Sequence, residues 1–223
     1  MHMKNVTKFW FLEDFNLMKK MGRMKLMQLC ELLEMTTISK GDELHFNRDD
    51  QQVIFFLKSG TVKVVSAESQ QTKYVIKKGN IFGELPLFDE TPDHDKAIAL
   101  EEGVICFIEQ PQMKEMLDQF PSLKNDLLKF NGLRIRKLER RLSDLLYKDS
   151  KTRIQEYILD YVRSFGTKEA ELIVAKNLLT HADVASLTNT SRQTVSNVLS
   201  SLRKEGVIDY NSKTIQIIDT KKQ

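Results

Sequence analysis

Residues 179–206, LTHADVASLTNTSRQTVSNVLSSLRKEG, decide the fold of the C-terminal part of the chain. Thr180, with Asp183 three residues later, predicts a helix start, because a hydroxyl and a carboxylate both suit the free N–H groups and positive dipole of a first turn. Ser191 predicts the cap of a second helix, and Asn189 tolerates the left-handed backbone that the turn between them needs. The apolar residues recur at helical spacing, at Val184, Leu187, Val195, Val198, Leu199 and Leu202.

The second predicted helix carries hydrogen-bonding side chains on the face opposite its apolar residues. Arginine can donate two bonds to guanine, and glutamine or asparagine can pair bidentately with adenine, when a helix N-terminus enters the major groove. A solvent-exposed polar face on an ordinary helical pair would look the same, so the following segment has to decide. The polar face comprises Ser191, Arg192, Gln193, Ser196 and Asn197.

The segment after this helix predicts a small β-hairpin. Basic residues and Gly206 end the helix, and 207–210 and 214–218 are two short strands around an Asn-Ser-Lys turn. The runs SRQTV (191–195), LRKEGVI (202–208) and YNSKTIQI (210–217) together resemble the winged-helix domain of the CRP/FNR (cyclic AMP receptor protein) family of bacterial transcription regulators.

This resemblance implies binding to double-stranded DNA. It assigns base contacts to Arg192, Gln193 and Asn197. Family members often carry Glu where Gln193 stands and Arg where Asn197 stands, which leaves the operator sequence open. Phosphate contact or helix capping is assigned to Thr180, His181, Ser191, Thr194 and Ser196.

From residue 35 the chain changes to short β segments separated by glycine turns, which favour an antiparallel β-roll or jelly roll. Residues 81–88, IFGELPLF, resemble the opening of the phosphate-binding cassette in cyclic-nucleotide-binding domains. The resemblance implies an effector pocket at Gly83, Glu84, Leu85, Lys96 and Ala97. The strands expected most clearly are 53–57, 61–66, 74–76, 98–100 and 104–108.

The cassette departs from the family pattern where the phosphate would bind. The family requires an arginine and a hydroxyl residue before the alanine that Ala97 matches, but this chain has Asp95 and Lys96. A buried phosphate needs a paired cation, and a lysine lacks the planar fork of arginine. We therefore expect neither cyclic AMP nor cyclic GMP to bind, and expect either another small-molecule effector or none.

A long helix is predicted over residues 122–147. Apolar residues three and four positions apart are typical of a two-stranded coiled coil, in which one asparagine can fix the register. A helix packed only on its own domain is the alternative. The resemblance places a dimer helix here and implies a homodimer on a palindromic operator, with half-sites about 34–36 Å apart or a multiple of that. The predicted seam is Leu128, Asn131, Ile135, Leu138, Leu142 and Leu145.

Composition argues against other classes of protein. No apolar run reaches the length of a membrane span and no secretory signal pattern is found, so we expect a cytoplasmic protein without a membrane partner. Cys30 and Cys106 form no C-x-x-C pair. The FNR branch of the resembled family holds an iron–sulfur cluster through several cysteines near its N-terminus, and this sequence has only Cys30 there, so no cluster is expected. The four histidines have no metal-ligand spacing, and no P-loop, G-x-S-x-G or H-E-x-x-H motif indicates an enzyme or a cofactor.

The sequence thus predicts an α+β protein with three parts. They are a cyclic-nucleotide-binding-like sensor roll (1–120), a dimerisation helix (121–148) and a winged helix–turn–helix (149–223). The predicted function is a homodimeric transcription regulator, with RNA polymerase and an effector as further candidate partners. An effector-independent DNA binder with a degenerated sensor pocket, and a protein-interaction module, are the alternatives. The effector, the operator and the choice between activation and repression stay open.

Overall fold

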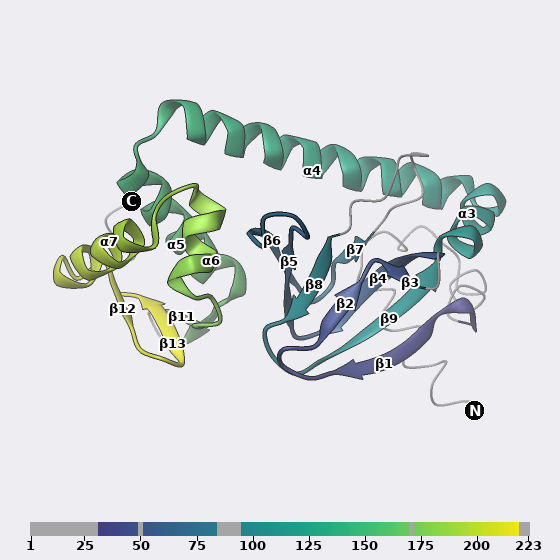
Figure 1. Cartoon of the computed structure of the whole chain (residues 1–223), viewed down its shortest axis with the longest axis horizontal. Helices are drawn as coiled ribbons and strands as arrows, with labels where there is room; N and C mark the ends of the chain where they lie inside the picture. The colour runs from purple at the N-terminus through teal and green to yellow at the C-terminus, as the bar shows by residue number, and fades with distance from the viewer. Residues whose placement is uncertain (1–30, 49–50, 84–94, 170–171, 219–223) are drawn as a thin grey trace. The chain divides into compact units, whose positions relative to one another are not determined.

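The computed structural model describes residues 31–48, 51–83, 95–169 and 172–218 (Figure 1). The chain forms two compact units, Met1–Lys137 and Leu138–Gln223. The parts predicted from the sequence divide after residues 120 and 148, which differs from this division, and the three-part organisation stays a prediction.

The N-terminal unit is built on antiparallel sheets, as the short apolar segments predict. One sheet has the order β1-β9-β4-β3, with β7 also paired to β4, and another has the order β2-β8-β5-β6. Their bounds are β1 Glu34–Ile38, β2 Glu43–His45, β3 Asn47–Arg48, β4 Gln51–Ser59, β5 Thr61–Val65, β6 Thr72–Lys77, β7 Ile81–Gly83, β8 Lys96–Ala99 and β9 Gly103–Glu109.

Strand β4 explains why the sequence shows a continuous apolar run. Val53, Phe55 and Leu57 belong to the core between the sheets, whereas Ile54 and Phe56 belong to a second core. The second core is closed by helix α3 (Gln110–Gln119) and the first turns of α4 (Pro121–Tyr147). Since alternate side chains of a strand point to opposite faces, β4 is buried on both sides.

Gly83, a residue of the predicted cassette, lies at the end of strand β7 in this sheet. It has φ +100° and pairs with Ile54, and a Cβ built on it would lie 2.4 Å from the Val53 carbonyl oxygen. Only glycine fits this close approach with a left-handed backbone. Gly83 thereby closes β7 onto β4.

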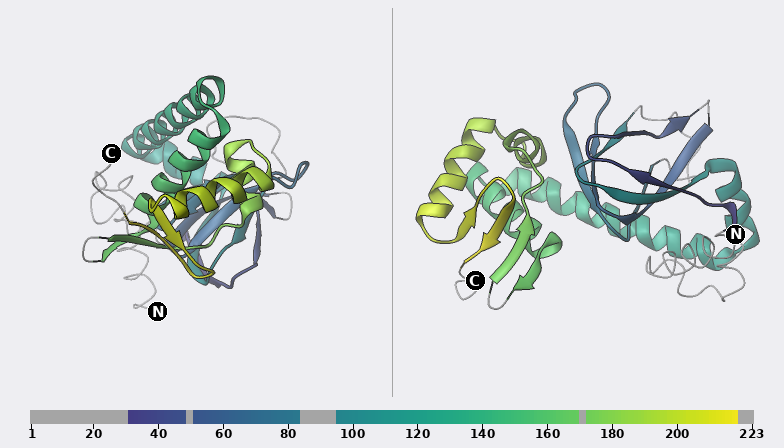
Figure 2. Two further views of the ribbon diagram at one scale, coloured as in Figure 1. Left: turned by 90° about the vertical axis from the view of Figure 1, so that its left-hand side faces the viewer. Right: turned by 90° about the horizontal axis from the view of Figure 1, so that it is seen from below.

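The C-terminal unit is a winged helix. Its sheet has the order β10-β11-β13-β12, and three helices pack on one another and against it (Figure 2). The bounds are α5 Ser150–Phe165, β10 Thr167–Glu169, β11 Leu172–Lys176, α6 His181–Thr188, α7 Arg192–Lys204, β12 Ile208–Tyr210 and β13 Thr214–Ile217. The predicted α+β class is confirmed, while β10 and β11 were not foreseen from the sequence pattern.

Local signals set the helix ends in this unit. Asp149 caps α5 by accepting the Thr152 N–H at 2.7 Å. The core faces of α5 and α7 meet through Ile154, Val162 and Leu202, none of which exposes measurable surface.

None of the described helices combines the length and apolar character that crossing a bilayer requires.

Candidate nucleic-acid interface

The helix–turn–helix is built by its caps, as the sequence predicts. Thr180 and Asp183 form a reciprocal capping box, in which the Asp183 N–H donates to Thr180 Oγ1 at 3.1 Å and the Thr180 N–H donates to Asp183 Oδ2 at 2.9 Å. Asn189 ends α6 in the left-handed conformation at φ 50°. Ser191 Oγ accepts the Thr194 N–H at 3.0 Å and starts α7. These contacts fix the direction in which α7 leaves the turn.

The capping contacts separate the two roles predicted for the hydroxyl residues. The Thr180 hydroxyl donates to Asp183 Oδ2 at 2.6 Å, and the Ser191 and Thr194 hydroxyls lie 2.8 Å apart. Capping is therefore confirmed for Thr180 and Ser191. Phosphate contact by these residues, and by the half-buried His181 and Ser196, stays a prediction.

Helix α7 separates its residues sharply into two faces. The apolar face is fully buried in the unit, at Val195, Val198, Leu199 and Leu202. On the opposite face Arg192, Gln193 and Asn197 are exposed. Gln193 Nε2 donates to Asn197 Oδ1 at 3.0 Å, across one helical turn. Within the described part of the chain, the Arg192 guanidinium has no hydrogen bond or ion pair.

Arg153 of α5 holds the turn between α6 and α7. Its Nε donates to the Thr188 carbonyl at 3.0 Å and its Nη2 to the Asn189 carbonyl at 3.3 Å. Nη1 donates to the Lys148 carbonyl at 2.6 Å. The guanidinium thus satisfies carbonyls that the end of α6 leaves without helical partners. No sequence pattern marks this residue, because its contacts with Thr188 and Asn189 span 35 and 36 positions.

The hairpin β12–β13 is held by a second network. Asn211 Oδ1 accepts the N–H groups of Lys213 and Thr214 at 2.7 and 2.9 Å, and Asn177 Nδ2 donates to the Asn211 carbonyl at 2.7 Å. These bonds shape a wing whose tip exposes Ser212 and Lys213. Asn177 is a further residue that sequence reasoning missed.

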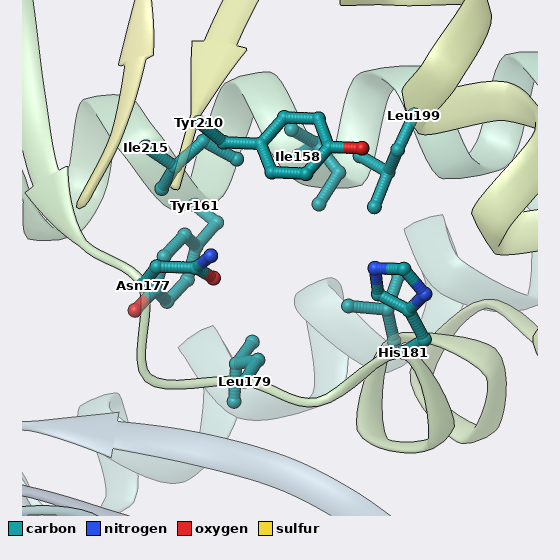
Figure 3. A pocket seen from close by; sticks show the side chains of 9 residues that line it. Ile158, Tyr161, Asn177, Leu179, His181, Leu199, Tyr210 and Ile215 are labelled. Carbon is teal, nitrogen blue, oxygen red and sulfur yellow. The ribbon is translucent and has the colours of Figure 1, made fainter. Parts of the chain in front are cut away.

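A small cavity lies beside the helix–turn–helix. Figure 3 shows the His181 imidazole, the Asn177 amide and the Tyr210 ring around it. Its volume of about 20 Å³ matches roughly one water molecule. A cavity of this size is a packing feature and has no room for an effector.

Comparisons with known proteins agree with this geometry. The family model for the cyclic nucleotide-binding domain matches residues 35–120, and the model for the Crp-like helix-turn-helix domain matches residues 152–222. The chain belongs to the CRP/FNR family of transcription regulators.

Relatives of this CRP/FNR regulator are named as regulators, not enzymes. The anaerobic regulatory protein of Bacillus subtilis is 29% identical over 191 residues, which cover 82% of this chain and 80% of that protein. The CRP-like cAMP-activated global transcriptional regulator of Mycobacterium tuberculosis is 23% identical over 197 residues, covering 87% and 88%. The prediction of a non-enzymatic regulator is confirmed by these relatives.

Solved structures share the fold. A CooA mutant from Carboxydothermus hydrogenoformans matches with a TM-score of 0.68 at 23% identity, covering 87% of this chain and 88% of that one. FixK2 from Bradyrhizobium japonicum matches with a TM-score of 0.69 at 16% identity, covering 84% and 93%.

The CRP/FNR regulator exposes an apolar stripe along α4. Of the predicted seam, Leu128, Ile135, Leu138 and Leu142 are 50–62% exposed, whereas Asn131 and Leu145 are half-buried. The last turn adds two exposed residues that the predicted seam did not include, Leu146 and Tyr147.

In the part of the sensor cassette that the structure describes, Asp95 and Lys96 form ion pairs within the chain itself. Asp95 Oδ2 accepts from Lys73 Nζ at 2.6 Å, and Lys96 Nζ donates to Glu43 Oε1 at 2.7 Å. The hydrogen bond from Lys96 lowers the pKa of the Glu43 carboxyl. Ala97 is fully buried in β8. The remaining predicted pocket residues, Glu84 and Leu85, lie outside the described residues.

Proposed function

We propose that this CRP/FNR regulator binds DNA as a homodimer, with the N-terminal half of α7 in the major groove of each half of a pseudo-palindromic operator. The observation that carries the proposal is the two-faced structure of α7. Its buried face anchors the helix, and Arg192, Gln193 and Asn197 project from the other. The major groove admits an α-helix, and these side chains match the edges of guanine and adenine.

Other exposed groups suit the phosphate backbone. The N-terminal ends of α6 and α7 favour negative charge, and each carries the hydroxyl of its cap residue, Thr180 or Ser191. Lys213 at the wing tip adds a cation. Phosphate contacts of this kind position a protein on DNA without selecting a sequence.

The α4 stripe supports self-association. Burying one leucine or isoleucine side chain fully stabilises a protein by about 1.5–3 kcal/mol, and these side chains are about half exposed in the single chain. A second copy of α4 would cover them at the spacing that a coiled-coil seam needs. A homodimer also gives the two-fold symmetry that a palindromic operator requires.

DNA binding and its dependence on the dimer are tested together. Fluorescence anisotropy with an operator selected from random duplexes measures affinity, and analytical ultracentrifugation measures assembly. R192A should weaken operator binding about 5- to 140-fold, the equivalent of about 1–3 kcal/mol, and leave non-specific binding nearly unchanged.

Two matched controls sharpen this test. K213A should weaken binding to all sequences alike and reduce the salt slope by about one, as expected for a lost phosphate contact. L138K should give monomers, whereas E139A, next to it on α4, should stay dimeric. Equal losses for R192A on operator and random DNA would contradict base reading by α7.

The sensor roll carries a second proposal, that it does not respond to cyclic AMP or cyclic GMP. The Lys73–Asp95 and Lys96–Glu43 pairs support it, because both lysines already pair with carboxylates of the chain itself. These pairs favour regulation by another effector or by none. A ligand that binds only the folded state raises the melting temperature. We therefore expect neither cyclic nucleotide, at millimolar concentration, to raise the melting temperature of this protein. A rise of several degrees would overturn this proposal.

A further inference from the structure

The two amides on the exposed face of α7 are joined by a hydrogen bond with a defined direction. Gln193 Nε2 is the donor and Asn197 Oδ1 the acceptor, at 3.0 Å. Both side chains are exposed, so DNA can reach them. The bond occupies one of the two Gln193 Nε2–H donors and one of the two Asn197 Oδ1 lone pairs.

The available atoms differ between the two residues. Gln193 keeps its Oε1 acceptor and one Nε2–H donor, which is the pattern that pairs bidentately with adenine N6 and N7. Asn197 keeps both Nδ2–H donors, while its oxygen has one of its two lone pairs occupied by Gln193. Two donors match the acceptor edge of guanine, at N7 and O6, or thymine O4.

We infer that Gln193 and Asn197 read DNA as one coupled amide pair, in which Gln193 selects adenine and Asn197 selects guanine or thymine. This inference rests on the proposed function, because it needs α7 to enter the major groove. It departs from the expectation for independent amides, since a free glutamine and a free asparagine would each prefer adenine.

Replacing one member of the pair should therefore change the base read by the other. In Q193E the carboxylate has no hydrogen to donate, and its oxygens would repel Asn197 Oδ1. Asn197 then turns its amide to donate Nδ2 to the carboxylate, and its oxygen faces the groove. Residue 197 should shift from guanine or thymine toward adenine or cytosine, although it is not itself mutated. Residue 193 should shift from adenine toward cytosine, whose N4 donates to a carboxylate.

The experiment selects bound duplexes from a randomised pool with the purified full-length chain and sequences them. The wild type should return a half-site with one adenine column and one guanine-or-thymine column. A wrong base at either should weaken binding about 5- to 140-fold. Q193E should change both columns, and N197D should change only the column of residue 197, because Gln193 can still donate to the aspartate. S212D adds the same charge at the wing tip and should leave both columns unchanged.

The outcomes separate the inference from the function on which it rests. Two adenine columns in the wild type, or a Q193E profile altered in a single column, would overturn the coupled pair while leaving sequence-specific binding intact. A wild-type pool without any enriched half-site would instead overturn the proposed DNA-binding function. Equal melting temperatures for the variants would show that neither result comes from misfolding.

Discussion

Arg153 offers the sharpest test of how the fold positions its recognition helix. R153A removes a guanidinium that donates to the carbonyls of Lys148, Thr188 and Asn189. Two of these bonds are partly shielded from water, and the third is exposed. The substitution should destabilise the C-terminal unit and loosen the turn that directs α7.

The expected size follows from the bonds lost. A hydrogen bond to a charged group contributes about 1.5–3 kcal/mol, and contacts shared by one side chain are not additive. Water can replace the exposed bond to Asn189 at little loss. The free energy of unfolding should therefore fall by about 2–4 kcal/mol. For a unit of this size the melting temperature should fall by about 10–20 °C.

Differential scanning calorimetry of the full chain can follow the transition of each unit. R163A is the matched control, because Arg163 lies on the same helix and its ion pair among the described residues is with the exposed Asp160 at 3.8 Å. That surface pair should contribute less than about 1 kcal/mol. R153K should recover part of the loss, since an ammonium can reach one of the carbonyls. Equal melting temperatures for R153A and R163A would refute the assignment of Arg153 to the turn.

Three further predictions concern single residues. S191A removes the α7 cap and should lower the free energy of unfolding by about 1 kcal/mol, read as a shift in urea midpoint. G83A places a Cβ 2.4 Å from the Val53 carbonyl oxygen at a positive φ, and should destabilise the N-terminal unit by more than about 1–3 kcal/mol in calorimetry. The Thr152 N–H lowers the pKa of Asp149 below its ordinary value of 3.8, so this cap stabilises α5 fully above that pH and less as the pH falls further. D149N should remove this acid dependence while still providing a capping side chain. If the free energy of unfolding of D149N changed between pH 5 and 2 as that of the wild type does, the assignment of the acid dependence to Asp149 would be wrong.

The helix–turn–helix was predictable from sequence because its determinants are local. The caps at Thr180 and Ser191 act within three residues, and the left-handed Asn189 needs no distant partner. Periodic apolar residues then mark the buried face directly. Each of these signals depends only on backbone geometry within one or two turns.

The contacts that shape the surface of the site were not predictable in this way. Arg153 reaches Asn189 across 36 positions, and Asn177 reaches Asn211 across 34. Strand β11 pairs with the distant strand β13, and the exposed strand β10, which pairs with β11, has no apolar pattern of its own. The direction of the amide bond between Gln193 and Asn197 also needs atomic positions, since the residue types allow either one to donate.

Helix α4 carries features of both interpretations of its sequence, the favoured dimer helix and the alternative of a helix packed on its own domain. Leu123 and Leu127 are buried against the helix's own β-roll, which satisfies the alternative of a helix packed on its own domain. The stripe from Leu128 to Leu142 lies on other positions of the same helix and remains exposed. A helix with two apolar faces can pack against two partners, and the described part of the N-terminal unit covers the face of Leu123 and Leu127. The proposed second partner is another copy of α4, which carries the same seam of leucine and isoleucine at coiled-coil spacing.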